Sequence, residues 1–254
     1  MSIKIVGLIA VTLFSITVFT GMIGIDSNGK LSNHNQIERQ KLIEKLEKKE
    51  DSFGLTLRER ARLAKAKGEG EVTLPQGETA TWVEFGSFNA TLSHCTAVIA
   101  RPIAMRTYIS KDDNIGTCYK FKSVEVLSEA PPSKYPFNSA NIFPELLPVR
   151  EDEFVLCRSG GTVEIDGVKL NAIERRFPPL VLTKKYLVFS EFSKDKKMAA
   201  LCYGGTSALV INENGTMDTL NGRQNNLKSA VDAQFSNSIE QLRNAFRNRA
   251  HVEK

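Results

Sequence analysis

Residues 115–127 read IGTCYKFKSVEVL, a run in which aromatic and β-branched residues recur between polar ones. This composition is typical of a β-strand. The turn signal Asp112-Asp113-Asn114 precedes the run, and further short runs of the same kind continue to about residue 220. We therefore expect the middle of the chain to consist of short strands separated by tight turns.

Two further turn signals, Asp166-Gly167 and Asn214-Gly215, mark hairpins in the same region. No internal repeat of 20–50 residues is present. Strands this short and this closely spaced predict a mainly β fold, a small antiparallel β-barrel or sandwich. The expected strands are at residues 81–85, 97–101, 107–110, 117–127, 154–158, 162–165, 168–172, 186–192, 198–203, 208–212 and 217–220.

Four motifs follow one another in this region: TCYKF at 117–121, GGTV at 160–163, YLVF at 186–189 and YGGT at 203–206. As an ordered set they resemble a β-rich module of exported bacterial proteins, over about residues 95–220. In that module a Thr-x-Tyr-x-Phe strand leads to a Gly-Gly-x-Val hairpin, a Tyr-Leu-x-Phe strand and a Gly-rich strand. The resemblance implies an exported β-domain, and it implies no activity and no catalytic residue. The chain departs from the pattern in its cysteines and in a proline-rich insertion.

The N-terminal segment, residues 1–30, carries 21 consecutive uncharged residues at 5–25. As a helix this run would span about 31 Å, close to the thickness of a hydrocarbon core. No convincing signal-peptidase site follows it, so we expect an uncleaved signal-anchor, a single transmembrane helix. A cleaved signal is the alternative. The positive flank at Lys30, Arg39 and Lys41 argues against export of the domain, whereas the cysteines considered below argue for it.

The chain has a formal net charge of +5. Residues 38–67 hold ten Lys or Arg against six Asp or Glu, so nearly all of the excess lies in one segment. The remaining chain is close to neutral, and we expect no nucleic acid as a partner. Residues 31–70 therefore predict a charged helical spacer, interrupted near Gly54. A dimerising coil and a basic face for anionic lipid are the alternatives.

Residues 223–254 are expected to form a C-terminal amphipathic helix, at about 225–249, and residues 71–222 the β-domain. The helix presents one apolar stripe, which predicts packing on the β-domain or on a partner. The stripe consists of Leu227, Val231, Phe235, Ile239, Leu242 and Phe246.

All four cysteines, Cys95, Cys118, Cys157 and Cys202, lie in the β-domain. An even number in a domain expected outside the cytoplasm predicts two disulfides, with three pairings open. Four buried thiols are the alternative. A zinc site is disfavoured because the cysteines do not come in closely spaced pairs. His94 next to Cys95 is interpreted as a half-exposed histidine beside a structural cysteine.

Residues 128–150 form an insertion that contains five prolines and lacks a periodic pattern. A loop of this length is often functional. Its aromatic residues Tyr135, Phe137 and Phe143 are candidate contacts for a partner.

No motif of a nucleophilic hydrolase, a zinc protease, a phosphate loop or a dinucleotide fold is present. We therefore predict no catalytic, cofactor-binding or metal residues. Gly160-Gly161 and Gly204-Gly205 are interpreted as bulges or close strand crossings. The expected function is binding or envelope interaction by a β-module anchored through residues 5–25 on the extracytoplasmic side of a bacterial membrane. The alternatives are a soluble periplasmic assembly or structural factor after signal cleavage, and an envelope hydrolase.

Overall fold

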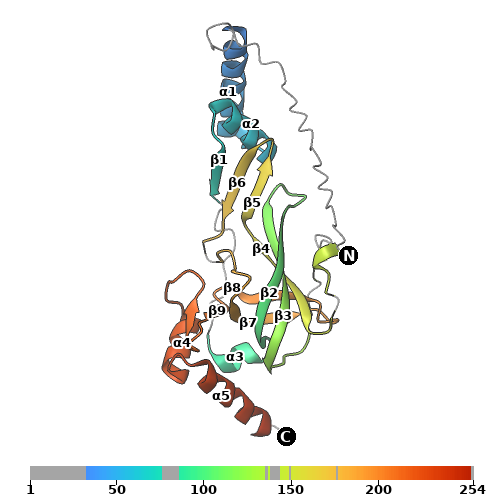
Figure 1. Cartoon of the computed structure of the whole chain (residues 1–254), viewed down its shortest axis with the longest axis vertical. Helices are drawn as coiled ribbons and strands as arrows, with labels where there is room; N and C mark the ends of the chain where they lie inside the picture. Colours follow the sequence, from blue (N-terminus) through green and yellow to red (C-terminus); the bar gives the residue numbers. More distant parts are fainter. Residues whose placement is uncertain are drawn as a thin grey trace, which may run out of the picture.

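The computed structural model describes residues 33–75, 86–134, 137, 144–148, 150–175 and 177–252. The described chain is mainly β, as the sequence predicts, with helices at its two ends (Figure 1). The expected strand at residues 81–85 lies outside the described residues. The expected transmembrane helix at residues 5–25 does so as well. Among the described helices none combines the length and the apolar character needed to cross a membrane.

Five strands form a closed barrel, which confirms the barrel and not the sandwich. They are β2 (Thr96–Ile109), β3 (Ile115–Ser128), β4 (Glu153–Ser159), β7 (Lys185–Phe192) and β8 (Met198–Gly205). Around the barrel the order is β2-β3-β4-β8-β7, and β7 pairs with β2 to close it. The β4–β8 pair is parallel, so the expectation of a wholly antiparallel barrel was wrong.

The barrel therefore has the strand order 1-2-3-5-4, closed on strand 1, with its third and fifth strands parallel. This order is the topology of the oligonucleotide/oligosaccharide-binding (OB) fold, a five-stranded Greek-key barrel. β2 is one long strand where the sequence predicts two, and its register against β3 shifts between Pro102 and Ala104. A proline at a bulge costs no ladder hydrogen bond, so the strand bends at Pro102 without ending.

The barrel interior is filled by aromatic and branched side chains. Phe121 on β3 stacks on Phe154 of β4 with ring centroids 5.1 Å apart. Tyr119 is fully buried, and its hydroxyl accepts a hydrogen bond from the backbone N–H of Leu180 at 3.0 Å. The phenol is thus satisfied inside an apolar core.

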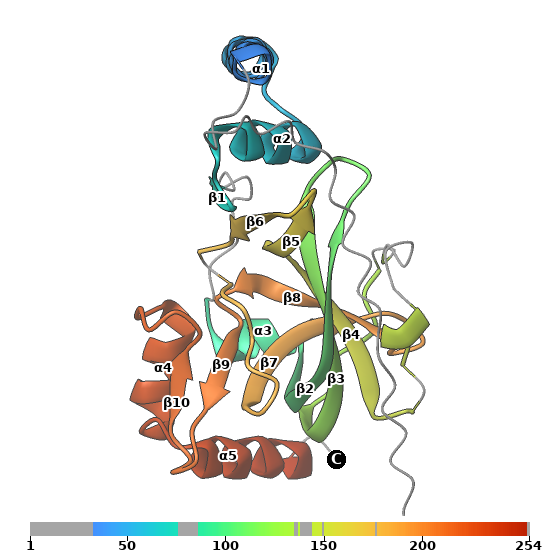
Figure 2. The ribbon, with the colours of Figure 1, turned by 45° about the horizontal axis from the view of Figure 1, so that its top comes forward.

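A second, small sheet has the order β1-β6-β5. Its strands are β1 (Glu71–Pro75), β5 (Gly161–Ile165) and β6 (Val168–Ile173). The β5–β6 hairpin is inserted between the third and fourth barrel strands, and β1 adds to it in parallel. The small sheet lies between the barrel and the N-terminal helices (Figure 2).

The expected spacer forms two helices, α1 (Asn33–Phe53) and α2 (Leu57–Lys67). Gly54 separates them with φ 74°, a conformation that favours glycine. α2 is not a solvated spacer, because Leu57, Ala61 and Ala64 are buried against the small sheet. The Asp113 carboxylate also accepts a hydrogen bond of 2.6 Å from the Leu57 N–H, which ties α2 to the β2–β3 turn.

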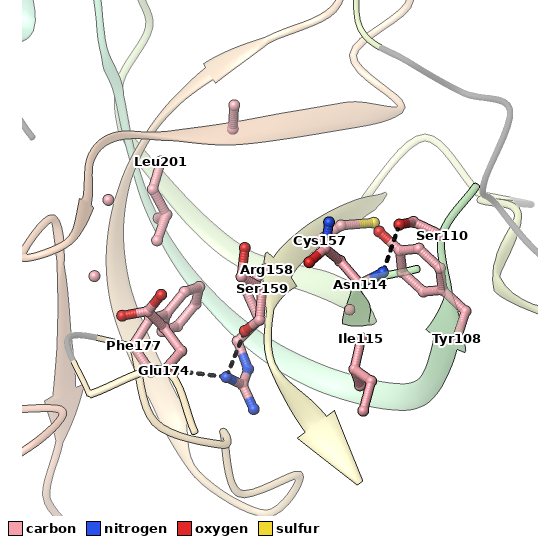
Figure 3. A pocket seen from close by; sticks show the side chains of 14 residues that line it. Tyr108, Ser110, Asn114, Ile115, Cys157, Arg158, Ser159, Glu174, Phe177 and Leu201 are labelled. Carbon is pink, nitrogen blue, oxygen red and sulfur yellow. Dashed lines mark hydrogen bonds between the residues drawn. The ribbon is translucent and has the colours of Figure 1, made fainter. Parts of the chain in front are cut away.

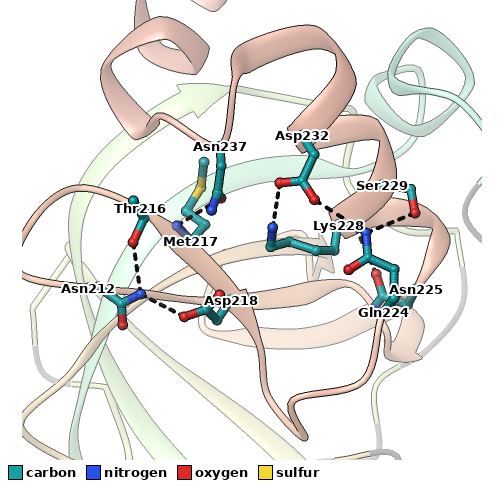
Figure 4. A network of polar contacts seen from close by, with 10 residues as sticks. All are labelled: Asn212, Thr216, Met217, Asp218, Gln224, Asn225, Lys228, Ser229, Asp232 and Asn237. Atoms are coloured by element: carbon teal, nitrogen blue, oxygen red, sulfur yellow. Dashed lines mark hydrogen bonds and ion pairs between the residues drawn. The ribbon is translucent and has the colours of Figure 1, made fainter.

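The C-terminal segment forms two helices, α4 (Asn226–Phe235) and α5 (Ile239–Val252), so the expectation of one continuous helix was wrong. Ser236 and Asn237 both have positive φ and end α4. The Asn237 side chain accepts a hydrogen bond of 3.0 Å from the Met217 N–H on β10 (Met217–Thr219), as Figure 4 shows. This contact holds the turn against the sheet, and asparagine tolerates the left-handed conformation that the turn requires.

The C-terminal apolar stripe packs on the β-domain, one of the two alternatives that the sequence leaves open. Leu227, Val231, Ile239, Leu242 and Phe246 are all buried there. They pack in one core with residues of β7, of β9 (Ala208–Ile211) and of the short helix α3 (Phe88–Leu92). The stripe is therefore used by the protein's own core.

Candidate functional site

A cleft of about 420 Å³ opens on the barrel where β4 and β8 separate. These strands pair only at Val155↔Met198 and Leu156↔Ala199. Beyond this point β4 and β8 form opposite walls, and the β2–β3 turn forms the rim; Figure 3 shows the arrangement. We call this space the barrel cleft. It is lined by Tyr108, Ser110, Asn114, Ile115, Gly116, Cys157, Arg158, Ser159, Glu174, Phe177, Ala200, Leu201, Gly204 and Gly205.

Arg158 is the buried cation of this cleft, with 7% of the residue exposed. Its Nη1 donates to the carbonyl oxygens of Ser159 and Phe177, each at 2.8 Å. The guanidinium carbon lies 5.8 Å from the centroid of the Phe177 ring, a cation–π contact. Its Nε is enclosed and has no hydrogen-bond partner. Arg158 is thus held by neutral groups, and part of its donor capacity is unused.

Small residues shape the cleft wall. A Cβ on Gly161 would lie 2.3 Å from the Thr117 Oγ1, and one on Gly116 would lie 2.6 Å from the Tyr108 ring. Gly160 has φ 83°, and its carbonyl oxygen accepts a hydrogen bond of 2.7 Å from the Thr117 hydroxyl. The Gly160-Gly161 pair is therefore a close crossing, as expected, and it positions the strand end that carries Arg158.

An adjoining cleft of about 660 Å³ shares Arg158 and Glu174 with the barrel cleft. It is also lined by Arg175, Arg223, Glu71 and Glu174. Arg175 and Arg223 are exposed. Among the described residues that line these two clefts there are therefore three guanidinium groups and two carboxylates.

A third cleft, of about 310 Å³, lies near the β7–β8 turn and the start of the proline-rich insertion. We call it the acidic cleft because four carboxylates line it: Glu129, Glu151, Asp152 and Glu153. Three of them face lysines. Glu153 lies 3.0 Å from the Lys120 Nζ, Asp152 lies 3.5 Å from that of Lys122, and Glu129 lies 3.2 Å from that of Lys196.

All four cysteines are paired, as Cys95–Cys202 and Cys118–Cys157. Cys118–Cys157 joins the neighbouring strands β3 and β4, and Cys157 lines the barrel cleft. Cys95 and Cys202 form, with His94, the one cluster of three potential metal ligands among the described residues. Both sulfurs are bonded to each other there, so they are not thiolates. The Nε2 of His94 lies 3.3 Å from the Tyr203 hydroxyl oxygen.

The aromatic residues of the insertion are only partly described. Phe137 is half-buried and lines none of the three clefts, while Tyr135 and Phe143 lie outside the described residues. The insertion itself reaches the barrel. Leu146 is buried against it, and the Leu147 carbonyl accepts a hydrogen bond of 3.1 Å from the Lys120 Nζ. The role of the three aromatic residues stays a prediction.

Sequence reasoning missed Arg158 as a site residue. The arginine follows the apolar run FVLC at 154–157 and precedes the Gly160-Gly161 pair. A charge at the end of a buried strand was the available signal, but the pattern alone does not show that β8 leaves β4 at this point. No family model, no curated protein and no solved structure is significantly similar to the chain.

Proposed function

We propose that this protein is an extracytoplasmic binding module, anchored in the membrane through residues 5–25, whose barrel takes a ligand in the barrel cleft. The observation that carries the proposal is the cleft at the separation of β4 and β8. Its volume of about 420 Å³ falls in the range of small-ligand sites. By analogy of fold alone, OB barrels bind oligosaccharides and oligonucleotides on the face of their second and third strands and on the loops that join strands 1 and 2 and strands 4 and 5. The loop between the fourth and fifth strands lines the acidic cleft. The loop between the first and second strands is the rim of the barrel cleft.

The extracytoplasmic location is supported by the two disulfides, since disulfides persist in oxidising compartments. The uncharged run at 5–25 and the resemblance to exported β-modules agree with it. A binding role is favoured over hydrolysis because the described lining of the barrel cleft holds one carboxylate, Glu174, and neither histidine nor free thiol. General acid–base hydrolysis by paired carboxylates would need a second acid there.

Topology is tested by treating intact spheroplasts that express the full chain with protease. Digestion of the domain without lysis is the expected result, and protection until lysis would contradict the proposed orientation. The mass of the mature protein separates an anchor from a cleaved signal. Alkylation without reductant is expected to leave all four cysteines unlabelled.

Ligand binding is tested on the ¹⁵N-labelled full chain in an uncharged detergent. Soluble oligosaccharides prepared from envelope polymers are added, and backbone amide signals are followed. We expect saturable shifts at Gly116, Gly204 and Gly205, which line the barrel cleft, and none at Asn244, an exposed residue of α5. Shifts confined to surfaces outside the barrel cleft would contradict the proposal.

A further inference from the structure

Arg158 combines burial with incomplete partners. Its Nη1 makes both hydrogen bonds of the group, to two backbone carbonyls, while its Nε is enclosed and makes none. Within the described part of the chain the guanidinium forms no ion pair. Because its hydrogen-bond partners are neutral, Arg158 lacks the paired counter-charge that usually accompanies burial, and an unsatisfied buried donor calls for an explanation.

A counter-charge for the Arg158 guanidinium can arrive from the clefts that this residue lines. Arg158 lines both the barrel cleft and the adjoining cleft. Both hydrogen bonds drawn from it in Figure 3 leave one Nη atom. Because Nε is enclosed, the other Nη atom is the donor that a ligand in these spaces would meet. The exposed Arg175 and Arg223 in the adjoining cleft add positive charge on the same side.

We infer that the barrel cleft recognises an oxyanion, a carboxylate or a phosphate, carried by a ligand whose remainder is largely apolar or a sugar ring. This rests on the proposed binding function and names the chemistry of its ligand. The anion pairs with the guanidinium of Arg158. The ring packs against Leu201, a half-buried side chain on the β8 wall, and the Ser110 hydroxyl at the rim offers a neutral donor. Guanidinium favours both oxyanions because its N–H donors match their geometry.

Glu174 allows a test of whether the ligand in the barrel cleft carries a negative charge. It lines both clefts together with Arg158, and its Cβ lies close to the same strand end, since a Cβ on Gly160 would be 3.2 Å from both the Glu174 Cβ and the Arg158 Nη1. A carboxylate in the cleft repels an incoming anion. Neutralising Glu174 should therefore strengthen anion binding, whereas a purely structural role of Arg158 predicts no such change.

The experiment uses the full chain in an uncharged detergent, labelled with ¹⁵N-arginine, and follows the Nε–H signal of Arg158. The probes are sodium glucuronate, inorganic phosphate, neutral glucose, and sodium chloride at matched ionic strength. We expect a saturable shift with glucuronate or phosphate and none with glucose or chloride. The tighter of the two anions identifies the source as an acidic sugar or as a phosphorylated compound.

Three variants complete the test. Arg158→Met is expected to weaken binding of the preferred anion at least about tenfold, the value of a charge-assisted hydrogen bond. Glu174→Gln is expected to tighten binding about two- to fivefold. Asn244→Asp, at an exposed position of α5, should leave the binding unchanged. If Arg158→Met does not fold, the wild-type response and the Glu174→Gln change still test the inference.

No saturable response of Arg158 to either anion, or an equal response to chloride, would overturn the inference. Unchanged or weaker binding in Glu174→Gln would do the same. Shifts of Gly116 and Gly204 with a neutral oligosaccharide, without a response of Arg158 to anions, would leave the binding function standing and remove the anion. Absence of any shift in the barrel cleft with every probe and oligosaccharide would remove both.

Discussion

The acidic cleft and the barrel cleft differ in how their buried charges are paired. In the acidic cleft Lys120 and Glu153 are both buried and lie 3.0 Å apart, and the more exposed Asp152 faces Lys122. In the barrel cleft Arg158 is just as buried, yet its guanidinium forms hydrogen bonds to carbonyl oxygens and a cation–π contact, and no ion pair with a described residue. A matched pair is consistent with a role in the folded chain alone. An unmatched cation, whose burial is costly, is consistent with a role toward something that the chain does not contain.

The largest expected effect is in the acidic cleft. Lys120→Met leaves the Glu153 carboxylate buried without its lysine, so we expect the free energy of unfolding to fall by about 3–5 kcal/mol. Urea unfolding of the full chain measures it. Lys122→Met is the matched control, because its pair with Asp152 is about 40% exposed at each side chain and should change stability by less than about 1 kcal/mol. Addition of Glu153→Gln to Lys120→Met should recover part of the loss. Equal losses of unfolding free energy in Lys120→Met and Lys122→Met would contradict the expected difference between the buried and the exposed ion pair.

The second effect concerns the disulfide in the wall of the barrel cleft. Replacing Cys118 and Cys157 together by serine should lower the free energy of unfolding by about 2–4 kcal/mol. The pair Cys95 and Cys202 closes a separation of 107 residues against 39 for Cys118 and Cys157. Its removal should therefore cost about 1 kcal/mol more, because a longer loop restricts the unfolded chain more strongly. Urea unfolding of both double variants checks the order, and a reversed order would contradict it.

A smaller effect on stability is expected at Arg158. Arg158→Met loses two hydrogen bonds to carbonyls but also removes a buried charge, so the two changes offset one another. We expect a net loss of about 1 kcal/mol, measured by urea unfolding. Arg175→Met, on the exposed rim of the adjoining cleft, is the control and should be neutral. A loss at Arg158 as large as that of Lys120→Met would show that Arg158 serves mainly stability, and the comparison of the clefts would fail.

The smallest effect is expected in the turn beside the acidic cleft. Hydrogen bonds from the Ser193 hydroxyl and from the Lys197 N–H lower the pKa of the Asp195 carboxyl. A lowered pKa in the folded state adds stability above the unfolded pKa of about 3.9, and this stability is lost as the pH falls through the folded pKa. Asp195→Asn should therefore make the free energy of unfolding, measured by urea unfolding at a series of pH values, depend less on pH in the acid range. Ser193→Ala should act in the same direction, and an unchanged pH dependence in both variants would contradict the assignment.

Much of the fold was predictable because its signals are local. The Asp166-Gly167 turn and the flanking β-rich runs give the β5–β6 hairpin, since two residues with positive φ suit such a turn. The break at Gly54 between α1 and α2 was predictable from the same preference for positive φ. The break between α4 and α5 was not, because Asn237 turns there to meet Met217, a residue 20 positions earlier in the chain.

The sequence by itself determined the mainly β class, the hairpin turns, the helical character of both ends and the residues of the C-terminal stripe. These depend on side-chain periodicity and on local backbone preferences, which a short stretch of chain carries complete. Only the tertiary structure decided the pairing of the cysteines, the parallel contact of β4 with β8 and the place of Arg158 between two clefts. Each of these depends on which distant segments meet, and the free energy of such contacts is set by burial and partners that no single stretch contains.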